Sequence, residues 1–347
     1  MNRSYRIHGA PRSRPGLTSG LALTGLGLLA SYLVVRAKTR QAERDNPPTG
    51  KFVTVDGVRL HYLERGEGPV LVLLHGNGTY SRDFEISGLV EGAAGHYRVI
   101  AFDRPGFGYS ERPRDTMWTP DNQARLLHHA LQALGVDNAI VLGHSWGTLV
   151  ALAMGLRVPH FVRALVLVSG YYYPSPRLDV ALSSPPALPL VGDLMRYTVA
   201  PLAGRLLWRG TLKRAFAPLK IPDGYRAMPA WMALRPSQLR ASAAESALMV
   251  PSAASLARRY ARLKVPVQVL SGTRDAVVDC THNAERLNER LRNCELGLEP
   301  GVGHMLHHAH PEKVLAAIDA IATRAGVPLA LHNARAEALA RASKSGV

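Results

Sequence analysis

The sequence predicts an α/β fold with a mostly parallel, doubly wound β-sheet. Residues 70–74 are five consecutive apolar residues, the pattern of a strand that is buried on both faces. Four further runs repeat this pattern at residues 97–102, 139–142, 164–168 and 265–270. Helical patterns separate the runs, and such alternation is typical of a parallel sheet with helices on both faces.

The other elements fit this architecture. Residues 52–55 and 59–63 are two short β-type runs around Asp56-Gly57, a favoured two-residue hairpin turn. Apolar residues at helical spacing predict helices at residues 121–134, 148–157 and 311–325. Ligands of such sheets bind beyond the carboxyl ends of the strands, so we expect the chemistry in the loops that follow them.

Length and composition exclude several classes of protein. The chain has 347 residues, of which 47% are hydrophobic and 20% charged, so it is not a disordered chain. Its 31 glycines and 24 prolines follow no period, which excludes collagen and solenoids. Cys280 and Cys294 are the only cysteines, which excludes a disulfide scaffold and a thiolate zinc site but leaves one bridge open.

The net charge of +16 is concentrated in two segments. Residues 1–50 hold eight Lys or Arg and two acids, and residues 171–264 hold fourteen and four. The rest of the chain holds twenty of each. No nucleic-acid motif accompanies this charge, so we expect no nucleic-acid partner. Attraction to anionic lipid head groups and a merely solvated basic face are the two interpretations left open.

Residues 17–35 form an uncharged run with seven leucines, long enough to cross a bilayer as a helix. Val35 occupies a position where signal cleavage needs a small residue, so we predict an uncleaved membrane anchor. A cleaved signal peptide is the alternative, and so is a transit segment, because the first acidic residue is Glu43. Four basic residues flank each side, so the positive-inside rule does not fix the orientation.

Residues 143–147, Gly-His-Ser-Trp-Gly, follow one predicted strand and precede a helical pattern. In this context the sharp turn strains the serine and exposes its Oγ, while Gly143 and Gly147 allow close backbone approach. The N-terminus of the following helix favours a developing anion. We therefore predict Ser145 as a nucleophile, the alternative being a structural turn serine.

Residues 75–78, His-Gly-Asn-Gly, follow the first buried strand. Glycines such as Gly76 let the backbone bend until an N–H group faces a substrate oxygen. We predict that the backbone N–H groups of Asn77 and Trp146 form an oxyanion hole. His75 is a possible base, but we expect it to be structural because a better-placed histidine exists.

Asp275 and His304 complete the predicted site. Asp275 ends the run Ser-Gly-Thr-Arg-Asp after the strand at residues 265–270, and His304 ends Gly-Val-Gly-His in a later loop. His304 would take the proton of Ser145, and Asp275 would fix its tautomer and stabilise the imidazolium. Asp279 is the alternative acid, because it lies one helical turn further on.

The histidines between His304 and His310 also suggest a metal site, since helical spacing would place several imidazoles on one face. Pro311 and the preceding glycines instead favour a loop that leads into a helix. We therefore predict neither a metal nor an organic cofactor.

Together these motifs resemble the α/β-hydrolase superfamily. HGNG, DRPGFGYSERP, GHSWG, GTRD and GVGH occur in the family's order between about Lys51 and Ala325. The second motif, which begins at Asp103, and the Trp after the nucleophile are most similar to the branch with epoxide hydrolases, haloalkane dehalogenases and haloperoxidase-like esterases. The first two use an Asp nucleophile, whereas this chain has Ser145. The resemblance therefore implies acyl chemistry, as in esterases, lipases or thioesterases.

The resemblance also implies a domain organisation. It implies an α/β-hydrolase core (51–170 and 265–325) with a cap insertion (171–264), while the residues themselves predict an N-terminal basic segment with anchor and linker (1–50) and an Ala-rich tail (326–347). Proline-broken apolar stretches at residues 188–207 and 228–239 predict helices in the cap. The cap side chains either select the acyl chain or simply cover the site, and both interpretations stay open.

The sequence thus predicts a membrane-associated serine hydrolase that cleaves small-molecule or lipid carboxylic esters. Acyl transfer, perhydrolysis, amide hydrolysis and C–C hydrolysis use the same triad and remain alternatives. A catalytically silent binding protein is the non-enzyme alternative, but its usual signature is a missing triad residue and none is missing. The substrate and the oligomeric state do not follow from the sequence.

Overall fold

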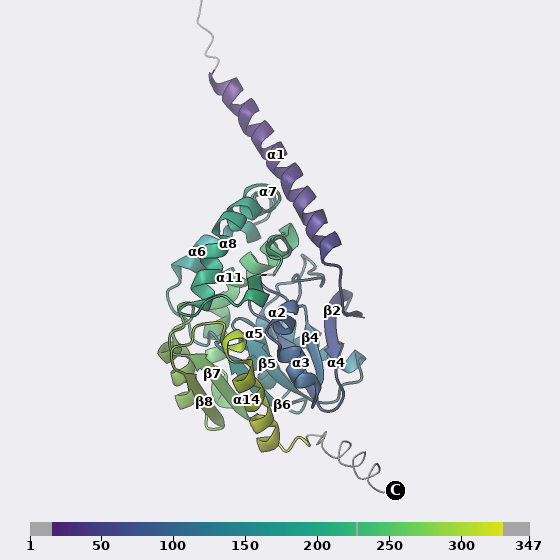
Figure 1. The fold of residues 1–347 in the computed structure, drawn as a ribbon, viewed down its shortest axis with the longest axis vertical. Helices are drawn as coiled ribbons and strands as arrows, with labels where there is room; N and C mark the ends of the chain where they lie inside the picture. Colours follow the sequence, from purple (N-terminus) through teal and green to yellow (C-terminus); the bar gives the residue numbers. More distant parts are fainter. Residues whose placement is uncertain (1–15, 227, 329–347) are drawn as a thin grey trace, which may run out of the picture.

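The computed structural model describes residues 16–226 and 228–328, and it confirms the predicted α/β architecture (Figure 1). The central sheet has eight strands: β1 (Lys51–Val55), β2 (Val58–Arg65), β3 (Val70–Leu74), β4 (Arg98–Phe102), β5 (Ala139–His144), β6 (Val162–Val168), β7 (Val267–Gly272) and β8 (Cys294–Glu299). Their order is β1-β2-β4-β3-β5-β6-β7-β8. The β1–β2 and β2–β4 pairs are antiparallel, and all other neighbours are parallel.

Helices cover both faces of the sheet. One face packs against α4 (Pro120–Ala133) and α5 (Gly147–Arg157), the other against α3 (Leu89–Ala94) and α14 (Pro311–Arg324). Short helices complete the core: α2 (Arg82–Ile86), η3 (Thr281–Glu285), α12 (Arg286–Arg290) and α13 (Leu306–Ala309). Cys280 and Cys294 are both free, so the bridge that the sequence left open is not formed.

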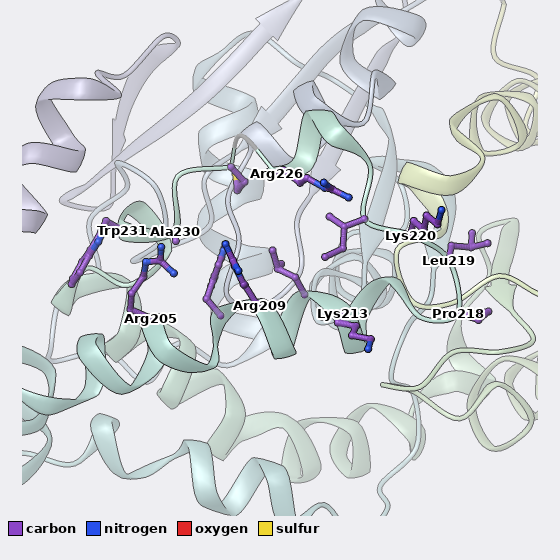
Figure 2. A pocket seen from close by; sticks show the side chains of 13 residues that line it. Arg205, Arg209, Lys213, Pro218, Leu219, Lys220, Arg226, Ala230 and Trp231 are labelled. Carbon is purple, nitrogen blue, oxygen red and sulfur yellow. The ribbon is translucent and has the colours of Figure 1, made fainter.

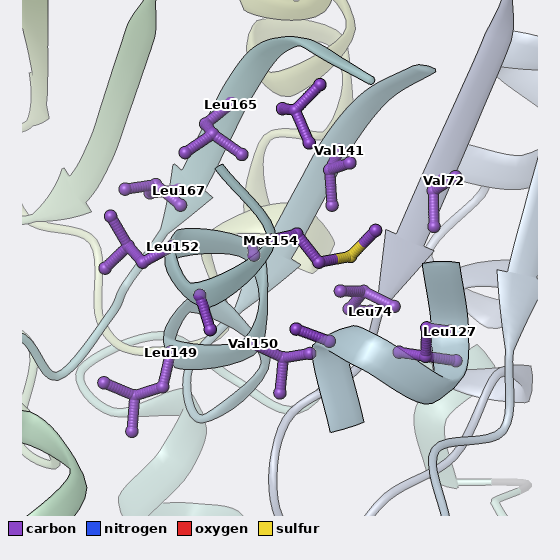
Figure 3. Close-up of a cluster of buried hydrophobic side chains, with 14 of the residues drawn as sticks. Val72, Leu74, Leu127, Val141, Leu149, Val150, Leu152, Met154, Leu165 and Leu167 are labelled. Carbon is purple, nitrogen blue, oxygen red and sulfur yellow. The ribbon is translucent and has the colours of Figure 1, made fainter. Parts of the chain in front are cut away.

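Helix α5 is buried from Gly147 to Gly155. Figure 3 shows its Met154 against Leu74 and Val141 of the sheet, and all three side chains are completely buried. The near-continuous apolar sequence of α5 is therefore explained by neighbours on every side. This enclosure fixes the N-terminus of α5, which follows the Gly-His-Ser-Trp-Gly turn.

Between β6 and β7 the chain forms a set of helices that we call the cap segment (residues 171–264). They are α6 (Leu178–Ser183), η1 (Pro185–Ala187), α7 (Val191–Tyr197), α8 (Val199–Phe216), α9 (Asp223–Arg226), α10 (Ala230–Ala233), α11 (Pro236–Ala257) and η2 (Tyr260–Arg262). The proline-broken stretches at residues 188–207 and 228–239 are helical, as predicted, and each is divided between two helices. The first breaks at Thr198 because Pro201 cannot donate to the Tyr197 carbonyl, and the second breaks before Pro236.

Helix α1 (Gly16–Asp45) projects from the body of the molecule (Figure 1). Within it, Ser19–Asp45 is long and apolar enough to cross a membrane, and only 6% of its most apolar window is buried. The helix extends ten residues beyond the predicted run, to Asp45. Its C-terminal half packs on the cap segment, where Val35 and Ala42 are buried. The predicted tail begins at Gly326, and its residues 329–347 lie outside the described part, as do the basic residues before α1.

Candidate active site

Ser145 lies in the tight turn between β5 and α5 with a left-handed φ of 52°. Such a φ is strained for a residue with a side chain, and in this turn it directs the hydroxyl outward. A Cβ at Gly143 would come within 2.6 Å of the Gly147 carbonyl oxygen, and one at Gly147 would overlap the Leu74 carbonyl oxygen. Both positions therefore require glycine.

The structure brings Ser145, His304 and Asp275 together. His304 Nε2 is 2.9 Å from Ser145 Oγ, and His304 Nδ1 is 2.8 Å from Asp275 Oδ2. The other carboxylate oxygen of Asp275 accepts hydrogen bonds from the backbone N–H groups of Val277 and Val278, at 2.7 and 2.9 Å. The fixed carboxylate holds the proton on Nδ1, which leaves Nε2 free to accept the serine proton.

Asp279, the alternative acid, is bonded elsewhere. Its Oδ1 accepts a hydrogen bond from the backbone N–H of His282 at 2.6 Å, at the start of η3. Of these two acids, only Asp275 hydrogen bonds His304, so the geometry favours Asp275 as its partner.

The predicted oxyanion groups flank Ser145. A Cβ at Gly76 would lie 3.1 Å from Ser145 Cβ, so the His-Gly-Asn-Gly loop rests directly on the serine turn. In the described part of the chain, neither Asn77 N–H nor Trp146 N–H donates to another group. Helix α11 holds both side chains, because Trp146 Nε1 donates to the Glu245 carbonyl at 3.1 Å and Asn77 Nδ2 to another α11 carbonyl at 3.2 Å.

The two supporting residues shape these loops. His75 Nδ1 donates to the Gly76 carbonyl at 2.7 Å, and its Nε2 accepts from the Arg104 N–H at 3.0 Å. Burial and the nearby Arg104 charge lower the pKa of His75 to about 3, so it is neutral. The buried Asp103 carboxylate accepts from two backbone N–H groups, both at 2.9 Å, and from His61. These contacts order the loops around the site.

A buried ion pair that the sequence did not predict joins the core to the cap segment. Arg104 and Glu245 are both completely buried, and Arg104 Nη2 donates to Glu245 Oε2 at 3.0 Å. Arg104 also donates to the His75 and Gly76 carbonyls at 2.8 and 3.0 Å. The sequence contains one signal for this pair: Glu245 is one of only four acids in the strongly basic cap segment. The pair therefore couples α11 to the His-Gly-Asn-Gly loop.

A second unpredicted cluster lies directly behind His304. The buried Asp83 accepts hydrogen bonds from Nε2 of His307 and Nε2 of His308, both at 2.9 Å. His144 Nε2 donates to the His304 carbonyl at 3.2 Å, and its ring centroid is 4.2 Å from that of His307. The cluster thus links the Ser145 turn, the His304 loop and α2, which carries Asp83.

Burial controls protonation in this cluster. It lowers the pKa of His307 to about 4, although Asp83 acts in the opposite direction, and it lowers that of His144 well below the usual value. Burial alone would raise the pKa of Asp83, but its two imidazole partners hold it well below the usual value. Potential ligand atoms of Asp83, His144 and His307 also lie within 4.8 Å of one another, so these three form a candidate metal-ligand group.

This candidate group differs from the run of histidines that suggested a metal in the sequence. Helix α13 contains only four residues, so it does not place His304 to His310 on one face. His310 bonds Glu312 instead, at 3.0 Å.

The profile of the alpha/beta hydrolase fold matches residues 69–311. The chain belongs to this family. Haloalkane dehalogenase 2 of Mycobacterium tuberculosis is 26% identical over 275 residues, which are 75% of this chain and 90% of the relative. A 2-hydroxymuconate semialdehyde hydrolase of Pseudomonas putida is 38% identical over 130 residues, which are 37% of this chain and 45% of the relative.

Solved structures of hydrolases share the fold of this α/β-hydrolase. A bacterial membrane phospholipase A has a TM-score of 0.62 at 24% identity, with 90% of this chain and 98% of that chain covered. A hydrolase from Pseudomonas aeruginosa PA01 has a TM-score of 0.66 at 23% identity, with 80% and 99% covered. These structures confirm the fold, while the family profile and the sequence relatives confirm the superfamily and its dehalogenase-like branch.

Proposed function

We propose that this α/β-hydrolase cleaves carboxylic esters through an acyl-enzyme on Ser145. The observation that carries the proposal is the hydrogen-bonded chain from Ser145 Oγ through His304 to Asp275, with links of 2.9 and 2.8 Å. A serine hydroxyl is a weak nucleophile until such a base removes its proton. Haloalkane dehalogenation needs a carboxylate nucleophile, whereas a hydroxyl occupies this position.

Each step follows from a contact in the site. Ser145 Oγ attacks the acyl carbon while His304 Nε2 takes its proton, and Asp275 stabilises the resulting imidazolium. The unpaired N–H groups of Asn77 and Trp146 bind the developing oxyanion. His304 then protonates the departing alcohol and activates a water that cleaves the acyl-enzyme.

Helix α1 supports a location at a membrane. Ser19–Asp45 has the length and hydropathy of a bilayer span, and Leu21, Leu23 and Leu26 are 69%, 69% and 64% exposed. An enzyme held there meets lipid esters, and a membrane phospholipase A shares its fold. We therefore propose an uncleaved anchor and lipid-ester substrates. Release of the intact full-length chain by carbonate extraction would contradict the anchor.

A second candidate, hydrolysis of a C–C bond, is favoured by one observation. The 38%-identical stretch belongs to a 2-hydroxymuconate semialdehyde hydrolase, and structural neighbours include a meta-cleavage product hydrolase. Both reactions share the triad. Comparing the full-length enzyme on medium-chain acyl esters and on 2-hydroxymuconate semialdehyde separates them, because the preferred substrate should have the larger kcat/KM by at least tenfold.

Fluorophosphonate labelling of the detergent-solubilised full-length protein, followed by peptide mapping, tests the nucleophile. We expect one adduct on Ser145 that disappears in Ser145→Ala and largely in His304→Ala. Asp279→Asn should label like the parent, because Asp279 bonds only the start of η3. An adduct that persists in Ser145→Ala, or equal labelling in His304→Ala, would contradict the proposal. Product partition between water and added alcohols then tests the acyltransferase alternative.

A further inference from the structure

The cap segment contains an elongated groove of about 890 Å³ between α8 and residues 218–231, which we call the cap groove. None of the described residues that line it is acidic. Five cationic side chains surround it, as Figure 2 shows: Arg205, Arg209, Lys213, Lys220 and Arg226. The groove therefore has a strongly positive potential and no internal counter-charge.

The lining between these cations is apolar. It includes the side chains of Trp208, Leu212, Ile221, Met228 and Trp231. A free inorganic anion would contact only the cations and would leave the apolar lining exposed to water. A cationic rim over an apolar, tryptophan-containing lining instead matches an amphiphile with an anionic head and an apolar tail.

The cations of the groove are mostly unpaired. Arg226 lies 3.4 Å from Asp223, which is 94% exposed. The other four have no ion-pair partner in the described part of the chain. Their mutual repulsion is reduced when an anion binds among them, so the groove gains stability from an anionic ligand.

The position of α1 indicates where the ligand comes from. Helix α1 contacts α8 and α10, which supply groove residues such as Arg205 and Trp231. Tyr32, inside the apolar run of α1, has its ring centroid 6.5 Å from that of Tyr197 at the end of α7. If the apolar run lies in a bilayer, this contact places the cap segment at the bilayer surface, the depth of lipid head groups.

Neighbouring apolar side chains support the same placement. Leu190, Leu194 and Leu206 expose 83%, 54% and 84% of their surface. Leu194 and Leu206 lie in α7 and α8, which both contact α1, and Leu190 directly precedes α7. Exposed leucines of this density are expected where a protein meets another apolar phase. Tryptophans with cations are typical of the membrane interface.

We propose that the cap groove binds the head group of an anionic membrane phospholipid, with its phosphate among the cations and its proximal acyl carbons against Trp208 and Trp231. This inference rests on the membrane anchor of the proposed function, but not on the chemistry at Ser145. The bound lipid docks the cap segment on the bilayer.

The groove is separate from the candidate active site but close to it. Met228 joins Phe216 and Tyr225 in one buried cluster. The rings of Phe216 and Tyr225 lie 5.6 and 4.8 Å from that of His308, which belongs to the cluster behind His304. One layer of side chains therefore separates the lipid from that cluster.

A titration with a soluble lipid tests the groove. Full-length Ser145→Ala in a maltoside detergent is titrated with dihexanoyl phosphatidylglycerol, and tryptophan fluorescence is followed. We expect saturable binding, and at least tenfold weaker binding of dihexanoyl phosphatidylcholine. Trp208→Phe with Trp231→Phe should remove the signal, because Trp118 and Trp146 are buried elsewhere. Use of the Ser145→Ala background makes the result independent of catalytic activity.

Matched charge variants locate the site. Arg209→Gln with Lys213→Gln should weaken phosphatidylglycerol binding at least tenfold, whereas Arg290→Gln with Arg292→Gln, the same charge change on exposed core residues, should change it less than twofold. If the first pair lowers the melting temperature, Arg205→Gln with Lys220→Gln replaces it. Equal binding of the two lipids, equal effects of both variant pairs, or binding of inorganic phosphate as tight as that of the lipid would overturn the proposal.

Discussion

The core and the cap segment of this α/β-hydrolase expose opposite kinds of surface. Outside α1, eleven of the thirteen exposed large hydrophobic side chains in the described chain lie in the cap segment, and only Met117 and Leu298 lie in the core. The cap segment also carries a charge of +10, whereas residues 51–170 and 265–347 are neutral in sum. The core completes its own burial, while the cap segment retains apolar and cationic surface for a partner.

The two regions meet through buried polar contacts. Glu245 of α11 reaches Arg104 in the core, and α11 carbonyls hold the side chains of Asn77 and Trp146. The cap segment therefore supports the candidate site from inside, although its outer surface suits a membrane. The following predictions separate these two roles.

The largest effect should follow from the acid in the core. Asp275→Asn leaves the geometry but removes the charge that fixes the His304 tautomer, so kcat/KM for an activated ester should fall about 10⁴-fold. Asp279→Asn, a neighbouring acid bonded to the η3 backbone, should stay within about twofold. Equal losses in the two variants would remove Asp275 from the proposed triad.

The contact between core and cap segment should dominate stability. Glu245→Gln leaves the fully buried Arg104 guanidinium without its counter-charge, and we expect about 3–5 kcal/mol lower free energy of unfolding in urea. Asp223→Asn, which removes the exposed ion pair with Arg226 within the cap segment, should leave the unfolding curve unchanged. A small effect of Glu245→Gln would mean that α11 does not depend on this pair.

The cluster behind His304 should affect turnover more than substrate binding. Asp83→Asn breaks one of two bonds to His307 and His308, so His304 loses support and kcat should fall about 10²-fold with little change in KM. His310→Gln, whose partner Glu312 is exposed, is the control. Equal kcat values in Asp83→Asn and His310→Gln would exclude a positioning role for Asp83. Elemental analysis of both variants shows whether the cluster of Asp83, His144 and His307 holds a metal.

Acid should destabilise the core rather than the cap segment. The core holds buried histidines, whereas the cap segment contains none. In the folded protein the pKa values of His75 and His307 are about 3 and about 4, against about 6.5 when unfolded. Between these pKa values the unfolded chain binds more protons than the folded chain. The contribution of the neutral histidines to the free energy of unfolding is therefore complete above pH 6.5 and is lost as the pH decreases toward 4. From pH 6.5 to 5 we expect a loss of about 1.5 kcal/mol for each histidine.

Urea unfolding at several pH values measures this dependence. His307→Gln should remove about a third of the loss, because the pKa values of His75 and His144 are also lowered in the folded state. An unchanged slope in that variant would contradict a neutral His307 in the folded state. His307 lies beside Asp83, His144 and His308. The double variant His307→Gln with Asp83→Asn, unfolded at the same pH values, reports whether the charges of these neighbours contribute to the pH dependence.

The smallest effect should come from the exposed leucines of the cap segment. Leu190→Ser with Leu194→Ser should leave the melting temperature unchanged, because both side chains are exposed. It should lower hydrolysis of an ester embedded in vesicles about fivefold and leave hydrolysis of a soluble ester unchanged. Met117→Ser, an exposed core position, should affect neither rate. Equal loss on both substrates would show that α7 serves the site rather than the membrane.

The sequence determined much of the fold because its signals are local. Each buried strand is a short apolar run, and Gly143 and Gly147 must flank Ser145 because any Cβ there collides with backbone. The order of the loops then placed Asp275 and His304 at the same edge of a parallel sheet. These features depend on neighbours in the chain or on one topological rule.

Only the tertiary structure decided the contacts around that site. Asp83 meets His307 across 224 residues of sequence, and Arg104 meets Glu245 across 141. No periodicity marks such pairs, because each partner alone resembles an ordinary surface charge. The packing of α1 on the cap segment likewise depends on which surfaces meet in space. Buried charges are tolerated only where a partner is present, and the partner is chosen by the fold.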